Sequence, residues 1–181
     1  MIAMKTRFAT LALFMVWAGL SGLSAQDKSP YRLGFHLRGL GGDFGLGLNL
    51  DIGTPDKWPT IRLGGTWHWQ EIPDGSDFET ASYQTFRVGV ASKSFQVQER
   101  IRAYGEGGFL AVLAGDDLSD DRFGPGGYGL FGFEFFVREY GGSALFIEIG
   151  GSSAGNGMDR APGVQSFGTG LWVGAGFRVP L

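Results

Sequence analysis

The sequence contains no cysteine. Disulfide frameworks, zinc sites built on thiolates and lipid attachment to an N-terminal cysteine are therefore excluded. Charged residues are also scarce, at 18 % of the 181 residues, against roughly 25 % in soluble domains. The formal net charge is −3, so the sequence does not indicate the strongly basic surface of a nucleic-acid-binding protein.

Long hydrophobic runs are absent except at the N-terminus. There, Lys5 and Arg7 precede an apolar segment at 8–20, and small residues ending at Ala25 follow. This order is typical of a secretory signal peptide, so we expect cleavage after Ala25 and one mature domain at 26–181. An uncleaved anchor helix is the alternative, but it would need about 20 apolar residues. No later segment approaches that length, so no transmembrane helix is predicted.

Glycine is abundant, with 33 residues, and aromatic residues make up 14 % of the chain. The C-terminal stretch at 170–181 shows how the two are combined. Leu171, Val173, Ala175, Phe177, Val179 and Leu181 alternate with Gly170, Trp172, Gly174, Gly176, Arg178 and Pro180. A strand projects successive side chains to opposite sides, so one face is apolar and the other is small or charged. The length suits a strand that crosses a bilayer, which takes about 9–11 tilted residues.

The same alternation recurs along the chain and predicts eight strands. They lie at about 31–38, 44–51, 61–70, 85–91, 101–112, 130–137, 145–150 and 170–181. We therefore predict an all-β fold, an eight-stranded antiparallel up-and-down transmembrane β-barrel. In the fifth strand the outward face meets Gly105 and Gly107, so we expect a bulge near Gly107 that turns Leu110 and Val112 outward.

The predicted connections differ in length between the two ends of the barrel. Three long loops are expected at 71–81, 114–127 and 151–164, and shorter connections at 53–59, 92–99 and 138–142. Long loops outside and short turns in the periplasm are the outer-membrane arrangement, with both termini on the periplasmic side. Aromatic residues near the strand ends suit an interfacial girdle. They are Tyr31, Trp58, Trp67, Trp69, Tyr128 and Tyr140.

A soluble barrel, such as a lipocalin-like periplasmic carrier, is the alternative architecture. Its apolar face would point inward and its polar face toward water. The second face of these strands is mostly glycine, which makes a poor water-facing surface but a good lining for a narrow lumen. The pattern therefore favours the membrane barrel.

The inward face carries most of the charged residues of the strands. The predicted lumen network is Arg32, Arg62, Arg87, Arg102, Glu106, Glu134, Glu148 and Arg178, and Arg38, His36 and His68 also point inward. In an eight-stranded barrel, side chains fill the interior. Because arginine pairs bidentately with carboxylates, we expect the three glutamates to pair with several arginines and close the lumen. A wider, water-filled pore with separate solvated side chains is the alternative.

Other candidate chemistry is sparse. Asp116, Asp117, Asp120 and Asp121 could bind Ca²⁺ through carboxylate oxygens, but their spacing does not match an EF-hand, so a solvated acidic loop is favoured. The two histidines, His36 and His68, show no nucleophile motif and no metal-ligand spacing. The sequence predicts no catalytic residue, no bound metal and no cofactor.

The terminal strand G-A-G-F-R-V-P-L, the preceding A-L-F-I-E-I-G-G and the signal peptide resemble small outer-membrane barrels of the OmpA, OmpX and opacity-protein type. The sequence departs from that pattern at its end, where Leu181 replaces the common phenylalanine and Pro180 precedes it. The resemblance implies a monomeric, non-enzymatic protein of the cell outer membrane, structural or interacting with the outside through its loops. Its implied partners are outer-membrane lipids and lipopolysaccharide, and the barrel-assembly machinery through the last strand.

Two other functions remain open within the same resemblance. Some eight-stranded barrels modify lipid A, which here would require His36 or His68 beside a serine and an acid. A small channel or hydrophobic-ligand conduit is the other alternative, and the charged lumen disfavours it.

Overall fold

The structure is a computed structural model that describes residues 29–40, 43–53, 59–74, 77–115, 119, 122–137, 142–155 and 167–181. The described residues form an all-β fold. The strands are β1 (Tyr31–Leu40), β2 (Asp43–Ile52), β3 (Thr60–Asp74), β4 (Asp77–Ala91), β5 (Phe95–Gln98), β6 (Ile101–Ala114), β7 (Phe123–Phe136), β8 (Ala144–Ala154) and β9 (Gly170–Pro180). The predicted signal peptide at 1–25 lies outside the described residues.

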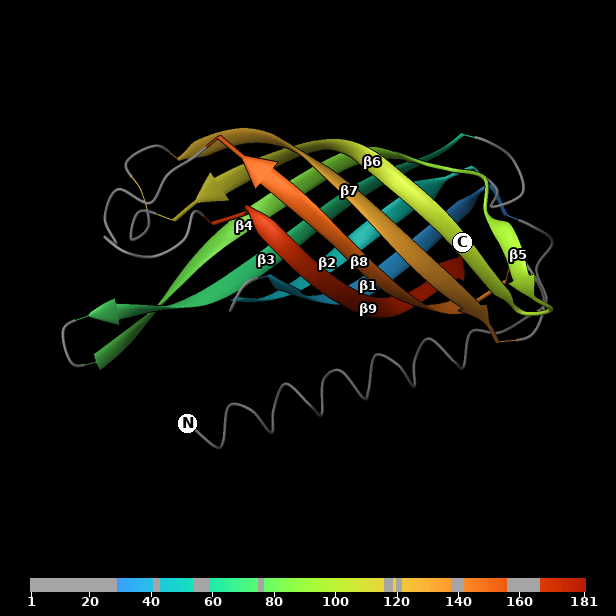
Figure 1. Cartoon of the computed structure of the whole chain (residues 1–181), viewed down its shortest axis with the longest axis horizontal. Coiled ribbons are helices and arrows are strands. Elements are labelled where there is room, and N and C mark those ends of the chain that lie inside the picture. Colours follow the sequence, from blue (N-terminus) through green and yellow to red (C-terminus); the bar gives the residue numbers. More distant parts are fainter. Residues whose placement is uncertain are drawn as a thin grey trace.

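Eight long strands close into an antiparallel barrel, as the alternation predicts. Each pairs with its neighbour in the chain, β4 pairs with β6 across the short β5, and β9 pairs with β1 from Arg32↔Pro180 to Leu40↔Trp172. Figure 1 shows the strands tilted around a common axis. Closure matters because it leaves no long strand with an unpaired edge along the wall.

The two faces of the wall have the predicted assignment. On β8, Leu145, Ile147 and Ile149 are 51–57 % exposed, whereas Phe146 and Glu148 between them are 1–3 % exposed. The most apolar surface of the protein is therefore on its outside and the charged residues are within. A soluble barrel would have the opposite arrangement. Among the described residues, no helix is long and apolar enough to cross a membrane.

The predicted long loop at 71–81 is wrong. β3 and β4 stay paired from Thr60↔Ala91 to Asp74↔Asp77. Within the described part of the chain, the pairing of β3 with β2 ends at Trp69, and the pairing of β4 with β6 begins at Tyr83. The hairpin tip therefore leaves the barrel as a two-stranded ribbon, which Figure 1 shows at the end opposite β5. The acidic composition suggested a loop, but the backbone hydrogen bonds of the ladder do not depend on side-chain charge.

The bulge expected near Gly107 is also absent. β6 pairs continuously with β4 from Tyr83↔Ala114 to Ala91↔Glu106, and with β7 throughout. Leu110 and Val112 consequently point inward and are 5 % and 0 % exposed, while Phe109 points outward. Glycines on the outward face need no compensating bulge, because Leu110 and Val112 find apolar partners inside the barrel.

Other connections are shorter than predicted. β7 already begins at Phe123, and β8 continues to Ala154, paired with Gly126 of β7. The polar connection at 92–99 contains β5, which pairs with the start of β6. Of the predicted girdle, Tyr31 and Trp67 are exposed, but Tyr128 is buried in the lumen, and Trp58 and Tyr140 lie outside the described residues.

Inward-facing glycines provide the space that the large lumen side chains occupy. A Cβ at Gly47 would lie 2.5 Å from Nε2 of His36, and one at Gly132 would lie 2.6 Å from the Tyr104 ring. A Cβ at Gly150 would lie 2.7 Å from the Trp172 ring. Because these positions carry no side chain, the charged and aromatic lumen residues fit in a barrel that is otherwise too narrow for them.

Candidate functional site: the barrel lumen

The lumen holds a buried set of ion pairs at its centre and its β5 end. Glu148 of β8 accepts hydrogen bonds through one carboxylate oxygen from Nη2 of Arg178 at 2.6 Å and from the Tyr104 hydroxyl at 2.5 Å. Glu134 of β7 accepts a hydrogen bond from Nη1 of Arg178 at 2.6 Å. Arg178 of β9 therefore links two carboxylates on neighbouring strands, and its guanidinium lies 3.9 Å from the centre of the Phe146 ring.

Arg62 of β3 connects this set to the other side of the barrel. Its Nε and Nη2 donate to the two oxygens of Asp51 at 2.6 and 3.0 Å, a bidentate pair. Its Nη1 donates to Glu106 and lies 3.4 Å from Oε1 of Glu148. Glu106 also accepts a hydrogen bond from the Tyr128 hydroxyl at 2.7 Å.

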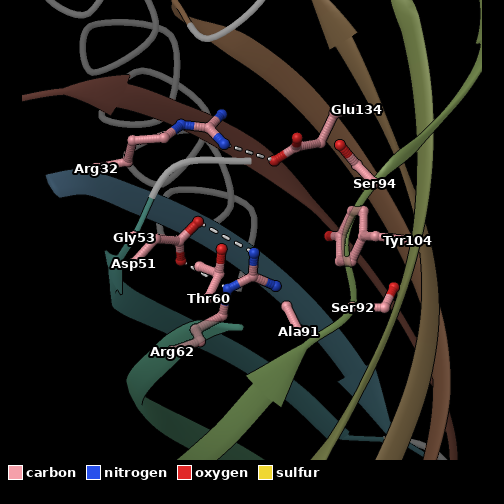
Figure 2. Close-up of a pocket in the computed structure, with 10 residues that line it drawn as sticks. All are labelled: Arg32, Asp51, Gly53, Thr60, Arg62, Ala91, Ser92, Ser94, Tyr104 and Glu134. Carbon is pink, nitrogen blue, oxygen red and sulfur yellow. Dashed lines mark hydrogen bonds and ion pairs between the residues drawn. The ribbon is translucent and has the colours of Figure 1, made fainter. Parts of the chain in front are cut away.

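Arg32 completes the set, with Nη1 donating to Glu134 at 3.0 Å. Figure 2 shows Arg32 and Glu134 on one side of a small cavity, with Asp51 and Arg62 on another and Tyr104 facing them. The cavity has a volume of about 20 Å³, which is room for about one water. We call this hydrogen-bonded set the ionic network. It consists of Arg32, Asp51, Arg62, Tyr104, Glu106, Tyr128, Glu134, Glu148 and Arg178.

The ionic network includes six of the eight predicted lumen residues, and the other two are Arg87 and Arg102. Arg87 packs its guanidinium 5.3 Å from the Tyr128 ring centre and 5.7 Å from the Trp172 ring centre. Arg102 is partly buried near the β5 end, opposite Glu134 in the β6–β7 ladder. Arg38, also inward-facing, lies 3.5 Å from the centre of the Trp172 ring.

Three members of the ionic network were not predicted from the sequence: Asp51, Tyr104 and Tyr128. Asp51 alternates with outward residues of β2, so its inward direction was readable, but its pairing with Arg62 depends on register. The Asp51↔Arg62 pair is a direct cross-strand pair of the β2–β3 ladder. Tyr128 resembled a girdle residue because it stands near a predicted strand end, and only the longer β7 places it inside.

The two histidines lie in the half of the lumen nearer the β3–β4 ribbon. Nε2 of His36 is 3.0 Å from the Thr66 hydroxyl. The His68 ring stacks on Tyr83 at 4.5 Å, with Nε2 at 3.2 Å from the Thr85 hydroxyl and Nδ1 at 3.2 Å from Oδ2 of Asp43.

The order Asp43, His68, Thr85 resembles an acid, base and hydroxyl relay. Thr85 is 4 % exposed and His68 is 1 % exposed, and the Tyr83 hydroxyl also donates to Asp43. Tyr83 and Val112 belong to the apolar cluster of the lumen, which includes Phe167. Asp43, His68 and Thr85 therefore form a buried contact that links β2, β3 and β4.

The acidic loop residues Asp116, Asp117, Asp120 and Asp121 lie outside the described residues. Within the part of the chain that the structure describes, no group of three or more acidic, histidine or cysteine side chains is arranged to hold a metal ion.

No protein-family model matches the sequence, and neither does any curated protein. Among solved structures, the N-terminal β-barrel domain of Pseudomonas aeruginosa OprF is similar, with a TM-score of 0.55 and 12 % sequence identity. The alignment covers 85 % of this chain and 98 % of that domain. At this identity the similarity concerns the fold, and it agrees with the small OmpA-type barrel that the sequence resembles.

Proposed function

We propose that the protein is a monomeric outer-membrane β-barrel without enzymatic activity, with a structural or surface-interaction role. The observation that carries the proposal is the inverted distribution of side chains: exposed aliphatic residues cover the wall and ion pairs fill the interior. A closed barrel can span a bilayer because every backbone group along the wall is paired. The similarity to the barrel domain of OprF supports the same location.

The proposed partners follow from the surface of the barrel. The exposed aliphatic residues of the wall contact the acyl chains of outer-membrane lipids. The lipopolysaccharide leaflet surrounds the end of the barrel that has the longer connections. The last strand, which ends at Pro180 and is followed by Leu181, would be the segment that the barrel-assembly machinery recognises. The β3–β4 ribbon reaches beyond the wall, so it is the described element best placed to meet a partner outside the cell.

The localisation is tested by fractionation and by mobility in SDS with and without boiling. We expect the mature protein in the outer-membrane fraction, migrating faster when unboiled because the closed barrel resists detergent. Release with the soluble periplasm and no mobility shift would instead support a soluble barrel carrier.

The closed lumen is tested separately in planar bilayers. Because guanidinium–carboxylate pairs fill the lumen, we expect no stable single-channel steps from the wild-type protein and measurable steps after Arg62→Ala, which removes the link between Asp51 and Glu106. Regular steps from the wild type would support the channel alternative. Lipid A mass spectrometry after expression tests the enzymatic alternative, and an unchanged mass is expected.

A further inference from the structure

Three side chains in the half of the lumen nearer the ribbon form a group that the ionic network does not include. Arg38 of β1 is 5 % exposed, Arg87 of β4 is 4 % exposed and Trp172 of β9 is 2 % exposed. Both guanidiniums lie near the same indole, at 3.5 and 5.7 Å from its ring centre, and the two arginines interact electrostatically. We call these three residues the arginine–tryptophan group.

The group carries buried hydrogen-bond donors without acceptors. Among the described residues, none accepts a hydrogen bond from Nε or Nη2 of Arg38, from Nε or Nη1 of Arg87, or from Nε1 of Trp172. Buried polar groups are almost always hydrogen-bonded, and a buried charge without a partner is costly. Five donor nitrogens in one part of the lumen, four of them on guanidinium groups, therefore indicate an acceptor that the described residues do not supply.

The acidic side chains in this part of the lumen already have other hydrogen-bond or ion-pair partners. Glu106 accepts hydrogen bonds from Arg62 and Tyr128, and Glu148 accepts from Arg178 and Tyr104. The third candidate, Asp43, contacts Tyr83 and His68. Glu148 and Glu106 interact electrostatically with Arg38, but the described residues leave the five named nitrogens without an acceptor.

The chemistry of these donors selects the class of ligand. A water molecule that accepts from two guanidiniums must itself donate two hydrogen bonds, and the unpaired groups here are all donors. An anion accepts from every side and also opposes the two like charges. We propose that the arginine–tryptophan group binds a small inorganic anion inside the barrel, held between Arg38 and Arg87 beside the indole N–H of Trp172.

Anion-dependent stability tests the site. The protein is refolded into lipid vesicles and unfolded in urea, since guanidinium chloride would itself supply an anion. Sodium chloride, bromide or phosphate replaces sodium gluconate at constant ionic strength, because gluconate is too bulky for the lumen. A ligand that binds only the folded state increases the folding equilibrium constant about tenfold for each tenfold increase in concentration above its dissociation constant. We expect this increase for the wild type.

Variants locate the effect. Arg38→Gln and Arg87→Gln each remove a charge from the group, so both should lose the anion dependence. Arg100→Gln is the matched control, because Arg100 is exposed at the β5–β6 turn, and it should respond like the wild type. The same slope in all four proteins would assign the effect to surface screening and overturn the proposal, as would no anion dependence in the wild type.

A direct measurement keeps the proposal testable if the lumen variants fail to fold. Wild-type crystals grown in bromide should show an anomalous peak within hydrogen-bonding distance of nitrogens of both arginines. A second crystal, grown in phosphate, tests for an oxyanion at the same place. If the bromide crystal shows no peak there and the phosphate crystal shows only water, the proposed site is overturned. Stronger stabilisation by phosphate than by chloride would identify an oxyanion as the occupant, and the reverse would identify a halide.

Discussion

Replacing Glu148 by glutamine is the sharpest perturbation of the ionic network. One carboxylate oxygen of Glu148 accepts hydrogen bonds from Arg178 at 2.6 Å and from Tyr104 at 2.5 Å, and it lies 3.4 Å from Nη1 of Arg62. Glutamine keeps the shape and one acceptor but removes the charge, and it introduces an amide with no acceptor opposite it. Glu148 is 3 % exposed, so water cannot take over these contacts without opening the barrel.

The expected loss follows from the number and type of these contacts. Removing one partner of a buried ion pair costs about 3–5 kcal/mol, because the other charge remains buried. Since glutamine retains one acceptor, we expect the lower end, about 3 kcal/mol, or roughly a hundredfold in the unfolding equilibrium. Urea unfolding in lipid vesicles, followed by tryptophan fluorescence, measures this change.

The control is Glu99→Gln at the exposed β5–β6 turn, which should change the free energy of unfolding by about 0.5 kcal/mol or less. A loss below about 1 kcal/mol for Glu148→Gln would refute the reasoning, because exposed ion pairs contribute about that much. It would mean that water reaches the carboxylate, and the lumen would then be a hydrated pore rather than a set of dry ion pairs.

Three further outcomes are expected. Gly47→Val should lower the yield of the folded barrel, measured as the fraction that migrates faster in SDS when unboiled, because its Cβ would lie 2.5 Å from a neighbouring backbone carbonyl. Gly39→Val is the control, since the nearest atom to its Cβ would be 3.6 Å away. Tyr83→Phe should cost about 1.5–3 kcal/mol in urea unfolding, since it removes a buried hydrogen bond to Asp43, and no loss would mean that the bond does not stabilise the fold. Ile149→Arg should cost about 2–4 kcal/mol in vesicles, as arginine does at mid-bilayer, whereas Thr80→Arg, at an exposed position of the ribbon, should be nearly neutral; equal effects would argue against a lipid-facing wall.

The barrel was predictable from the sequence because its two faces differ so strongly. Once the wall is taken to face lipid, alternating residues such as Ile147 and Glu148 allow only one arrangement, in which Ile147 points outward and Glu148 points into the lumen. The strand ends were harder to predict. Composition at 71–81 suggested a loop, yet the segment contains Gly75 and Ser76, and Gly-Ser is a common two-residue hairpin turn. Giving that signal more weight would have revealed the extended β3–β4 ribbon.

The lumen contacts could be predicted only in part. Alternation shows which residues point inward, and it identified the arginines and glutamates. It does not show which of them meet across the barrel, because that depends on strand tilt and on the relative register of strands far apart in sequence. Arg62 and Glu148 come from strands on opposite sides of the barrel and meet across the lumen. Arg87, in contrast, packs on aromatic rings instead of a carboxylate. A pattern along one strand carries no information about either outcome.

The ionic network has a consequence for the order of folding. Arg32 and Glu134 are 102 residues apart in sequence, and Arg178, on the last strand, links Glu134 and Glu148. Contacts of such long range form late, because the intervening chain must be ordered first. Until β9 meets β1, a partly assembled barrel in the membrane would hold arginines and glutamates without their counterions. Incomplete barrels are therefore the least stable species along the pathway, and the chain is committed to the bilayer only when its first and last strands are joined.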